Sequence, residues 1–349
     1  MTSTDWRLAE NRREAFLRYF LFEIETKGQT GNVYSFLPAI AEEKELPPDD
    51  LLWLAWLDAN TENPITSLLL LDASADGMNV EGAIDLWRVR YETLSWDRDR
   101  RYQKRDFETA TRAFVQSPAA LAGTWESVAE QEGWEGVWKL AKSLPSMGRL
   151  SAWYLYEVVR LLLGADKIPD MGSLLLRDKS GSRSHRNGLA YIAGHDSAPA
   201  WKAGDADLLG LVPELEALGE DLLDEARERS DDPWISRLTL ETALCAFKGW
   251  STRRRRYPNV YVDEFYYKIR DAEKVWGPRF EVLWEARKRD LPDWLRLEDT
   301  PNDPGIVEEK SLHFQRTGQP VNLSRLYEDM PSAFDDFVEL GIYGRRADA

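Results

Sequence analysis

The sequence of 349 residues is poor in the side chains that build disulfides and metal centres. It has a single cysteine, Cys245, and three histidines, His185, His195 and His313. A single cysteine excludes an internal disulfide framework and is typical of a reducing compartment. So few histidines and cysteines form no recognisable zinc, haem or iron–sulfur spacing. We therefore expect neither a metal ion nor another cofactor.

Long apolar runs are also missing, because no stretch approaches the length that spans a membrane. The first residues, Met-Thr-Ser-Thr-Asp-Trp, do not resemble a signal peptide. The sequence contains no Gly-x-x-x-x-Gly-Lys-Thr loop, no dinucleotide-binding fingerprint and no Gly-x-Ser-x-Gly. We expect a cytoplasmic protein with no membrane partner whose reaction uses neither nucleotide hydrolysis nor a nicotinamide.

The chain is acidic, with 61 Asp and Glu against 45 Lys and Arg and a formal net charge of −16. This balance argues against a general nucleic-acid coat, because non-specific DNA affinity comes mainly from neutralising phosphates. Two basic clusters, in residues 98–105 and 253–256, are exceptions. Such runs are usually solvated faces, but a confined basic strip can also bind DNA locally. The charge pattern therefore leaves DNA binding open.

Apolar residues recur at helical spacing along most of the chain, and no segment shows the two-residue alternation of a strand. The pattern predicts an all-α fold, with one two-lobed helical domain over residues 1–300. Residues 301–349 are richer in Pro, Gly and Asp and predict an extension that wraps the surface. The helices are expected at residues 5–26, 51–59, 65–71, 84–96, 107–114, 119–130, 134–144, 150–162, 208–229, 234–250, 262–276 and 278–288, with short ones near 323–329 and 331–340.

A short connection, Leu144 to Ala152, joins two of these helices and defines a helical hairpin at about residues 134–163. Pro145 ends the first helix, and Gly148 is expected to take the positive φ of a tight reversal. The second helix then begins with unpaired backbone N–H groups at the positive end of its dipole, which suits a phosphate. A simple αα-hairpin with a glycine turn explains the same residues equally well.

A second cluster, residues 182–188, reads Ser-Arg-Ser-His-Arg-Asn-Gly, and no apolar residue follows until Leu189. No core segment is expected to need that composition. One interpretation makes Ser184 the N-cap of a helix that starts at His185, with solvated arginines. The interpretation we favour is that the helix start, two arginines and the histidine converge on an anion.

A third cluster begins at Thr239 and contains Glu241 and Cys245, which share one helix face. Cys245 lies among apolar residues, so a small buried thiol is the preferred interpretation. The arginine run at 253–256 precedes an aromatic-rich helix, which suits phosphates and bases but is equally compatible with packed core.

Three blocks together resemble one family. They are Asn63-Pro64 after the Trp53/Trp56 helix; Leu144–Ala152 leading to Gly181–Leu189; and Thr239–Thr242 with Cys245–Phe247, Arg256–Pro258 and Asp263. The sequence resembles, over roughly residues 50–290, the amino acid:DNA transferases of bacteriophages, also described as α-glutamyl/putrescinyl-thymine pyrophosphorylases. These are helical relatives of helix-hairpin-helix DNA glycosylases.

The resemblance implies thymine hypermodification in the host cytoplasm during phage infection. The substrate would be double-stranded DNA in which a DNA kinase of the same pathway has phosphorylated or pyrophosphorylated 5-hydroxymethyluracil. A free amino acid, glycine or another small amine among the candidates, would displace phosphate or pyrophosphate at the 5-methylene carbon. The base would be extruded from the duplex.

The resemblance also assigns roles, which we state as expectations. The hairpin residues Gly148, Arg149 and Ser151, with Arg183, Arg256 and Tyr257, would bind DNA or phosphate. Arg186 would also bind the leaving phosphate, and His185 would move a proton, with Ser184 and Asn187 beside them. Asp170, with Asp166 and Asp178 as rivals, stands near the place of the glycosylase carboxylate. Glu241 and Asp263 would bind substrate. Cys245 could instead act as a covalent catalyst at C6 of uracil.

Two other classes of function remain open. A DNA glycosylase would hydrolyse the N-glycosidic bond, although the phosphate-binding character of residues 182–188 favours a phosphorylated substrate. A non-enzymatic DNA-binding or assembly protein would tolerate alanine at Ser184, His185, Arg186 and Asn187 with little loss beyond affinity.

Overall fold

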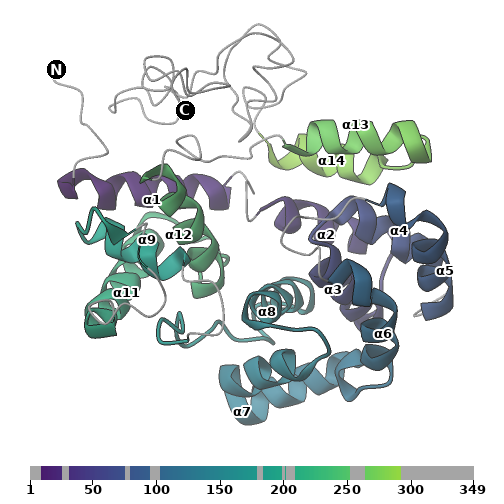
Figure 1. Cartoon of the computed structure of the whole chain (residues 1–349), viewed down its shortest axis with the longest axis horizontal. Coiled ribbons are helices and arrows are strands. Elements are labelled where there is room, and N and C mark those ends of the chain that lie inside the picture. The colour runs from purple at the N-terminus through teal and green to yellow at the C-terminus, as the bar shows by residue number, and fades with distance from the viewer. Residues whose placement is uncertain are drawn as a thin grey trace, which may run out of the picture. The chain divides into compact units, whose positions relative to one another are not determined.

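The computed structural model describes residues 9–25, 31–74, 79–94, 103–178, 184–198, 201, 209–251 and 264–291. Every long regular element in these residues is a helix (Figure 1), so the all-α prediction is confirmed. The chain divides into two compact units. The first unit contains Met1–Gly31, Ser173–Tyr267 and Lys288–Ala349, and the second contains Asn32–Gly172 and Lys268–Arg287.

The second unit is built around α3 and α8. Its helices are α2 (Gly31–Glu43), α3 (Pro48–Thr61), α4 (Pro64–Ser74), α5 (Val80–Arg90), α6 (Gln103–Val115), α7 (Ala122–Ser143), α8 (Arg149–Leu163) and most of α13 (Glu264–Trp276) and α14 (Glu281–Asp290). Short 3-10 turns lie at Tyr91–Thr93 and Pro118–Ala120. Helix α8 packs against both α3 and α7. Four tryptophans, Trp53, Trp56, Trp125 and Trp153, are among the largest fully buried side chains, which accounts for part of the high tryptophan content.

Local sequence explains where α3 and α4 begin. Pro48 occupies the start of α3, where a missing N–H costs nothing, and two acidic residues follow in the first turn. The turn to α4 places Glu62 at φ 47°. Asn63 then caps α4, because its Oδ1 accepts hydrogen bonds from the N–H groups of Ile65 (3.1 Å) and Thr66 (3.4 Å). The Asn63-Pro64 pair is therefore a helix start.

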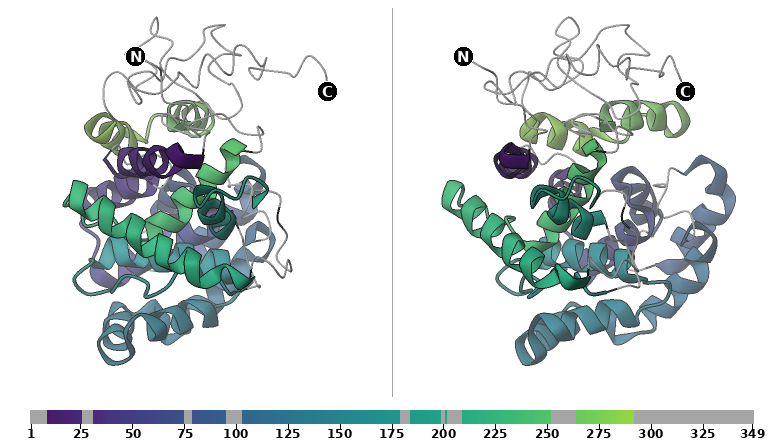
Figure 2. Two further views of the ribbon diagram at one scale, coloured as in Figure 1. Left: turned by 90° about the vertical axis from the view of Figure 1, so that its left-hand side faces the viewer. Right: turned by 60° about the vertical axis from the view of Figure 1, so that its left-hand side comes forward.

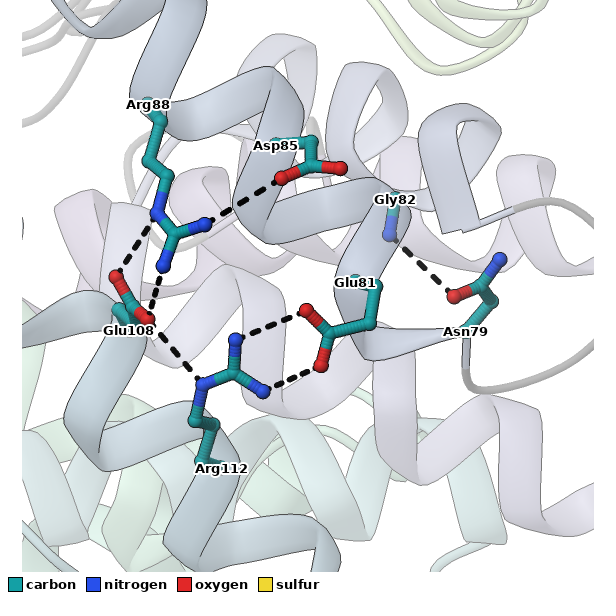
Figure 3. A network of polar contacts seen from close by, with 7 residues as sticks. All are labelled: Asn79, Glu81, Gly82, Asp85, Arg88, Glu108 and Arg112. Atoms are coloured by element: carbon teal, nitrogen blue, oxygen red, sulfur yellow. Dashed lines mark hydrogen bonds and ion pairs between the residues drawn. The ribbon is translucent and has the colours of Figure 1, made fainter.

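Surface ion pairs connect α5 with α6 (Figure 3). Glu108 accepts hydrogen bonds from Arg88 and Arg112, and Arg112 also donates to both carboxylate oxygens of Glu81. The hydrogen bonds from Arg112 and Arg88 lower the pKa values of Glu81 and Glu108 respectively. All four side chains are exposed or nearly so, so the network orients the helices more than it stabilises them.

The first unit surrounds one short helix. It contains α1 (Ala9–Glu25), α9 (Ser184–Ile192), α11 (Val212–Arg229) and α12 (Arg237–Ser251). Helix α9 contacts α1, α11 and α12, and both views of Figure 2 show it against α12. Arg12 of α1 lies 3.9 Å from the ring centroid of Tyr191 and donates a hydrogen bond to the carbonyl oxygen of Tyr191. Helix α9 is therefore a core helix.

Most of the expected helices are present, but their ends differ. Helix α5 ends at Arg90, before the expected Trp96. The two helices expected at 119–130 and 134–144 form the single element α7, which kinks where Gly133 takes φ 62°. Helix α2, which contains Pro38, was not predicted. The expected helices after residue 300 lie outside the described residues. In the part that the structure describes, no helix has the length and apolar character of a membrane span.

Candidate functional site

The hairpin between α7 and α8 has an anchored base and an exposed tip. Leu144 and Met147 are buried, whereas Ser146 and Gly148 are exposed. The expected positive φ at Gly148 is wrong: Gly148 has φ −69°, and Ser146 makes the reversal at φ 62°. A Cβ atom at Gly148 would meet nothing within 4 Å. Neither backbone conformation nor packing within the described residues therefore requires glycine at this position.

The two polar side chains that follow the tip, Arg149 and Ser151, differ in burial. Arg149 is 1% exposed, and its guanidinium carbon lies 5.2 Å from the ring centroid of Trp153. This cation–π contact lies within α8, whereas the edge-on packing of Trp153 on Trp138, with ring centroids 6.1 Å apart, holds α8 against α7. Ser151 is half-buried in the first turn of α8. Of the residues expected to bind DNA here, the backbone of Gly148 and the side chain of Ser151 are the accessible ones.

Four polar residues lie along α8, each three positions after the one before. They are Ser151, Tyr154, Glu157 and Arg160, and we call them the polar row. At its inner end the hydroxyl of Tyr34 donates to Oε1 of Glu157 (2.9 Å). Burial raises the pKa of Tyr34 well above its ordinary value, and the Glu157 carboxylate adds to the effect. Asp170 belongs to the same group, because its charge raises the pKa of Tyr34 further while Arg160 opposes it. Asp170 itself is half-buried in the second unit, and its Oδ1 accepts a hydrogen bond from the backbone N–H of Met171 (2.8 Å).

The sequence analysis missed a buried carboxylate on α3 that accepts a hydrogen bond from Tyr154 of the polar row. Asp58 of α3 is 0% exposed. Its Oδ1 accepts a hydrogen bond from the hydroxyl of Ser67 (2.8 Å), and its Oδ2 accepts one from the hydroxyl of Tyr154 (2.6 Å). Thr61 lies 2.8 Å from Ser67, oxygen to oxygen, and Asn63 donates its backbone N–H to Thr61. We call these five residues, Asp58, Thr61, Asn63, Ser67 and Tyr154, the Asp58 cluster. The only signal in the sequence was the Asn63-Pro64 pair.

In the first unit, His185 and Arg186 hold a neighbouring segment through its backbone. Nε2 of His185 lies 3.1 Å from the carbonyl oxygen of Leu174, and Nη1 of Arg186 donates to the carbonyl oxygen of Leu176 (3.1 Å). Both side chains are 2% exposed, so the expectation that no core segment has this composition is wrong. The alternative of a solvated arginine is wrong for Arg186 as well. We call residues 173–178 the strap.

The geometry of His185 assigns the hydrogen on one of its ring nitrogens. A carbonyl oxygen only accepts, so Nε2 of His185 carries the hydrogen that binds Leu174. Nδ1 lies 3.2 Å from Oε1 of Glu241, which is also buried. His185 and Glu241 therefore form a buried polar pair between α9 and α12 in the first unit.

The rest of this block packs α9 into place. The Nδ2 group of Asn187 donates to the carbonyl oxygen of Trp201 (3.0 Å). Gly188 lies so close to α12 that a Cβ atom would stand 2.4 Å from the carbonyl oxygen of Leu244. Ser184 begins α9 and is half-buried. Helix α12 starts with a reciprocal pair between Ser236 and Thr239, each backbone N–H bonding the other's hydroxyl.

The structure sorts the expected site residues into two groups. Gly148, Arg149, Ser151 and Asp170 lie in the second unit, and Ser184, His185, Arg186, Asn187 and Glu241 lie in the first. Of the rivals to Asp170, Asp166 lies in the second unit and Asp178 in the strap. Cys245 is half-buried, so the expected buried thiol is met only in part. Arg183, Arg256, Tyr257 and Asp263 lie outside the described residues.

The described residues contain no arrangement typical of a metal site. Across the described ranges, no group of three or more His, Cys, Asp or Glu side chains is arranged to hold a metal ion. The polar groups that bear on the expected site are the hairpin tip, the polar row with the Asp58 cluster, and the His185–Glu241 pair.

Comparison with known proteins bears on both units. The model of the amino acid:DNA transferase family matches residues 50–257, a range that includes the hairpin, the strap and α9. A protein of Salmonella phage ViI named serinyltransferase is 28% identical over 265 residues. That alignment covers 70% of this chain and 64% of the phage protein, less than two thirds of its length. No solved structure is significantly similar.

Proposed function

Because the chain belongs to the amino acid:DNA transferase family, we propose that it joins an amino acid to a modified thymine in DNA. The acceptor is double-stranded DNA whose 5-hydroxymethyluracil carries a phosphate or pyrophosphate from an upstream DNA kinase. The amine nitrogen of a free amino acid forms a bond to the 5-methylene carbon, and phosphate or pyrophosphate departs with the electron pair of the broken C–O bond. The name of the phage relative makes serine the first amino acid to test.

The observation that carries this proposal is the range of the family match. Residues 50–257 include most of α3, the hairpin and the α9–α12 core, so the similarity is not confined to one helical hairpin. A helix-hairpin-helix element in a glycosylase-like fold forms part of the proposal. The exposed tip at Gly148, with an extended φ and no neighbour for a side chain, is compatible with close approach of a DNA phosphate.

The roles that we propose for the described residues follow the accessibility of each group. The backbone at Gly148 and the hydroxyl of Ser151 bind the DNA backbone. Arg183, Arg256 and Tyr257, which lie outside the described residues, are proposed to bind it with them. His185, Arg186, Asn187 and Glu241 are buried, so we propose that they position the strap and the segment that follows it. We propose that the charge of Asp170 helps to position the last turn of α8, where Arg160 lies. Ser184 and Asp263 remain candidates for substrate contacts.

The experiment is to incubate the protein with duplex DNA that carries phosphorylated or pyrophosphorylated 5-hydroxymethyluracil and an equimolar mixture of amino acids. The DNA is then digested to nucleosides and analysed by mass spectrometry. A new nucleoside with the mass of an amino-acid adduct supports the proposal and identifies the amino acid. Abasic DNA would indicate a glycosylase, and unchanged DNA with measurable binding would indicate a binding protein; either result would overturn it.

A further inference from the structure

Two neighbouring residues of α9 hold the strap by its backbone. The carbonyl oxygen of Leu174 lies 3.1 Å from Nε2 of His185. That of Leu176 accepts a hydrogen bond from Nη1 of Arg186 (3.1 Å). The side chain of Leu174 also packs against α11, since a Cβ atom at Gly219 would stand 3.0 Å from its Cδ1. The strap is therefore fixed to the core of the first unit at both of these leucines.

Leu175, between the two anchored leucines, has a backbone conformation that leucine rarely adopts. Its φ is 53°, where the Cβ atom of an L-residue crowds the backbone. Leu174 and Leu176 are both buried, whereas Leu175 is only half-buried. Strained backbone of this kind persists only where surrounding contacts enforce it, and it is enriched at functional sites. The contacts with α9 and α11 thus hold the strap in a shape that its own residues do not favour.

The strap ends in a turn that exposes Arg177. The backbone N–H of Asp178 donates to the carbonyl oxygen of Leu175 (2.9 Å). Leu176 and Arg177 therefore occupy the two central positions of this turn. The peptide group that joins them is planar, and it contains the carbonyl group that Arg186 binds. The backbone of Arg177 is thus fixed, while its side chain is exposed.

No acidic side chain in the described ranges pairs with the guanidinium group of Arg177. Other arginines there do have a carboxylate partner: Nη2 of Arg13 lies 2.9 Å from Glu225, and Nη2 of Arg229 lies 2.8 Å from Glu14. Arg177 forms no ion pair, side-chain hydrogen bond or ring contact with any described residue. The chain carries 61 Asp and Glu residues, yet none of the described ones neutralises this group. The guanidinium group is therefore available to an anion from outside the chain.

The chemistry of a guanidinium group favours a phosphate ligand. Its planar fork of N–H donors binds two oxygens of a phosphate at once, and the group is only weakly hydrated. A solvated arginine needs no anchored backbone, because a flexible loop exposes it equally well. An anchored strap matters when the arginine must meet its ligand at one defined place. The family match at residues 50–257 includes the whole strap.

We propose that Arg177 binds a phosphate group of the acceptor DNA, and that His185 and Arg186 are positioning residues that act through the strap. The inference rests on the proposed function. The acceptor offers phosphate oxygens in two places, on the 5-methylene carbon of the modified base and along the DNA backbone. In the first place, Arg177 stabilises the negative charge that grows on the leaving group as the C–O bond breaks. In the second, it holds the strand that carries the reactive base.

The test compares Arg177→Gln with a matched control, Arg279→Gln. Arg279, between α13 and α14, is also exposed, forms no ion pair with a described residue and lies outside the family match. Each variant removes one positive charge from an exposed position. With duplex DNA that carries phosphorylated 5-hydroxymethyluracil, we expect Arg177→Gln to weaken binding by about tenfold, the loss of one hydrogen bond to a charged group. Arg279→Gln should weaken it by no more than about twofold, because a distant charge is screened. Fluorescence anisotropy measures both, and equal losses would overturn the proposal.

A second duplex, identical but unmodified, distinguishes the two sources of phosphate. If Arg177 binds the phosphate on the base, we expect the loss to be confined to the phosphorylated duplex. If it binds the DNA backbone, we expect equal losses with both duplexes, and the slope of log K against log salt concentration to become shallower by about 0.9. Unchanged binding of both duplexes with a raised KM for the amino acid would assign Arg177 to the carboxylate of the amino acid and would overturn the proposal.

A double-mutant cycle tests the positioning role of Arg186. We expect Arg186→Lys, which keeps the buried charge but not the planar fork, to weaken DNA binding by itself. It should add little to the loss in Arg177→Gln, because both changes act on one contact. A loss in the double variant equal to the product of the two single losses would contradict action through the strap. Circular dichroism checks that each variant is folded, and Arg177→Gln, a change of an exposed side chain, decides the phosphate contact even where Arg186→Lys does not fold.

The binding titrations contain no free amino acid, so they do not depend on turnover. If the wild type transfers no amino acid, the proposed function fails, while the comparison of Arg177→Gln with Arg279→Gln still decides the phosphate contact. If the wild type transfers an amino acid and the two variants bind DNA equally, the proposed function stands and this inference alone is overturned.

Discussion

Gly188 of α9 and the carbonyl oxygen of Leu244 of α12 approach so closely that a Cβ atom at position 188 would lie 2.4 Å from that oxygen. The obstacle is backbone and cannot rotate away. We therefore expect Gly188→Ala to push α9 from α12 and lower the free energy of unfolding by about 1–3 kcal/mol, the usual cost of overpacking. Thermal or urea unfolding followed by circular dichroism measures the change.

The control for this variant is Gly123→Ala near the start of α7. A Cβ atom there would meet nothing within 4 Å. Alanine in a helix is then neutral or stabilising by up to about 1 kcal/mol. If Gly188→Ala behaves like Gly123→Ala, the close packing of α9 and α12 is not as described.

His185 and Arg186 hold the strap through the carbonyl groups of Leu174 and Leu176. Replacing either by alanine removes a buried hydrogen bond and leaves a cavity, which together cost about 2–4 kcal/mol. We expect amide hydrogen exchange in the strap of either variant to be faster than in the wild type, while exchange in the second unit stays the same. Mass spectrometry measures the exchange. Arg88→Ala, which removes a surface ion pair, is the control. Unchanged exchange in the strap would contradict its attachment to α9.

Gly148→Val tests the hairpin tip without a packing penalty inside the chain. Its φ of −69° is accessible to any residue, and a Cβ atom meets nothing within 4 Å. Stability is expected to fall by no more than about 1 kcal/mol, the loss of a favourable N-cap residue. DNA affinity, measured by fluorescence anisotropy, is expected to fall by about fivefold or more, because the side chain keeps a phosphate from the backbone. Unaltered affinity would make the hairpin a structural turn.

Glu14 of α1 makes stability of the first unit depend on pH. A hydrogen bond from Arg229 of α11 lowers the pKa of Glu14 below its ordinary 4.5. The carboxylate therefore stabilises the fold above pH 4.5, and the contribution is lost as pH falls through the lower pKa of the folded state. Glu14→Gln should cost up to about 1 kcal/mol at neutral pH, because the pair is largely exposed. The free energies of unfolding of the wild type and of Glu14→Gln, plotted against pH, should then converge in acid. The same change at Glu10, an exposed carboxylate of α1, is the control, and parallel curves at all pH values would contradict the pairing.

Helix positions were predictable because apolar spacing and start signals agree along the chain. Pro48 and Pro64 open α3 and α4 three residues and one residue before the expected starts at 51 and 65. Helix α2 escaped prediction, since the burial of its apolar residues overrides an internal Pro38. The reversal in the hairpin was assigned to Gly148, but Ser146 makes it. Local sequence indicated that a turn exists, but it did not indicate that Met147 is buried or that Ser146 takes the positive φ.

The residues of the site were harder to interpret than the helices. The composition of residues 182–188 indicated a polar surface, yet His185 and Arg186 are buried, because backbone carbonyls of the strap satisfy them. No short-range pattern marks Asp58 as the centre of a hydroxyl cluster, because its partner Tyr154 is 96 residues away in the chain. Contacts of that range follow from the packing of α3 against α8, which periodicity alone does not predict.

The most direct measurement of the central claim follows both products of one reaction. Duplex DNA carrying radioactive phosphate on its 5-hydroxymethyluracil is incubated with the protein and tritiated serine, or with the amino acid that mass spectrometry identifies. The account predicts that tritium enters the DNA and radioactive phosphate or pyrophosphate leaves it in equal amounts. Release of phosphate without incorporation of the amino acid, or no change in either label, would contradict it.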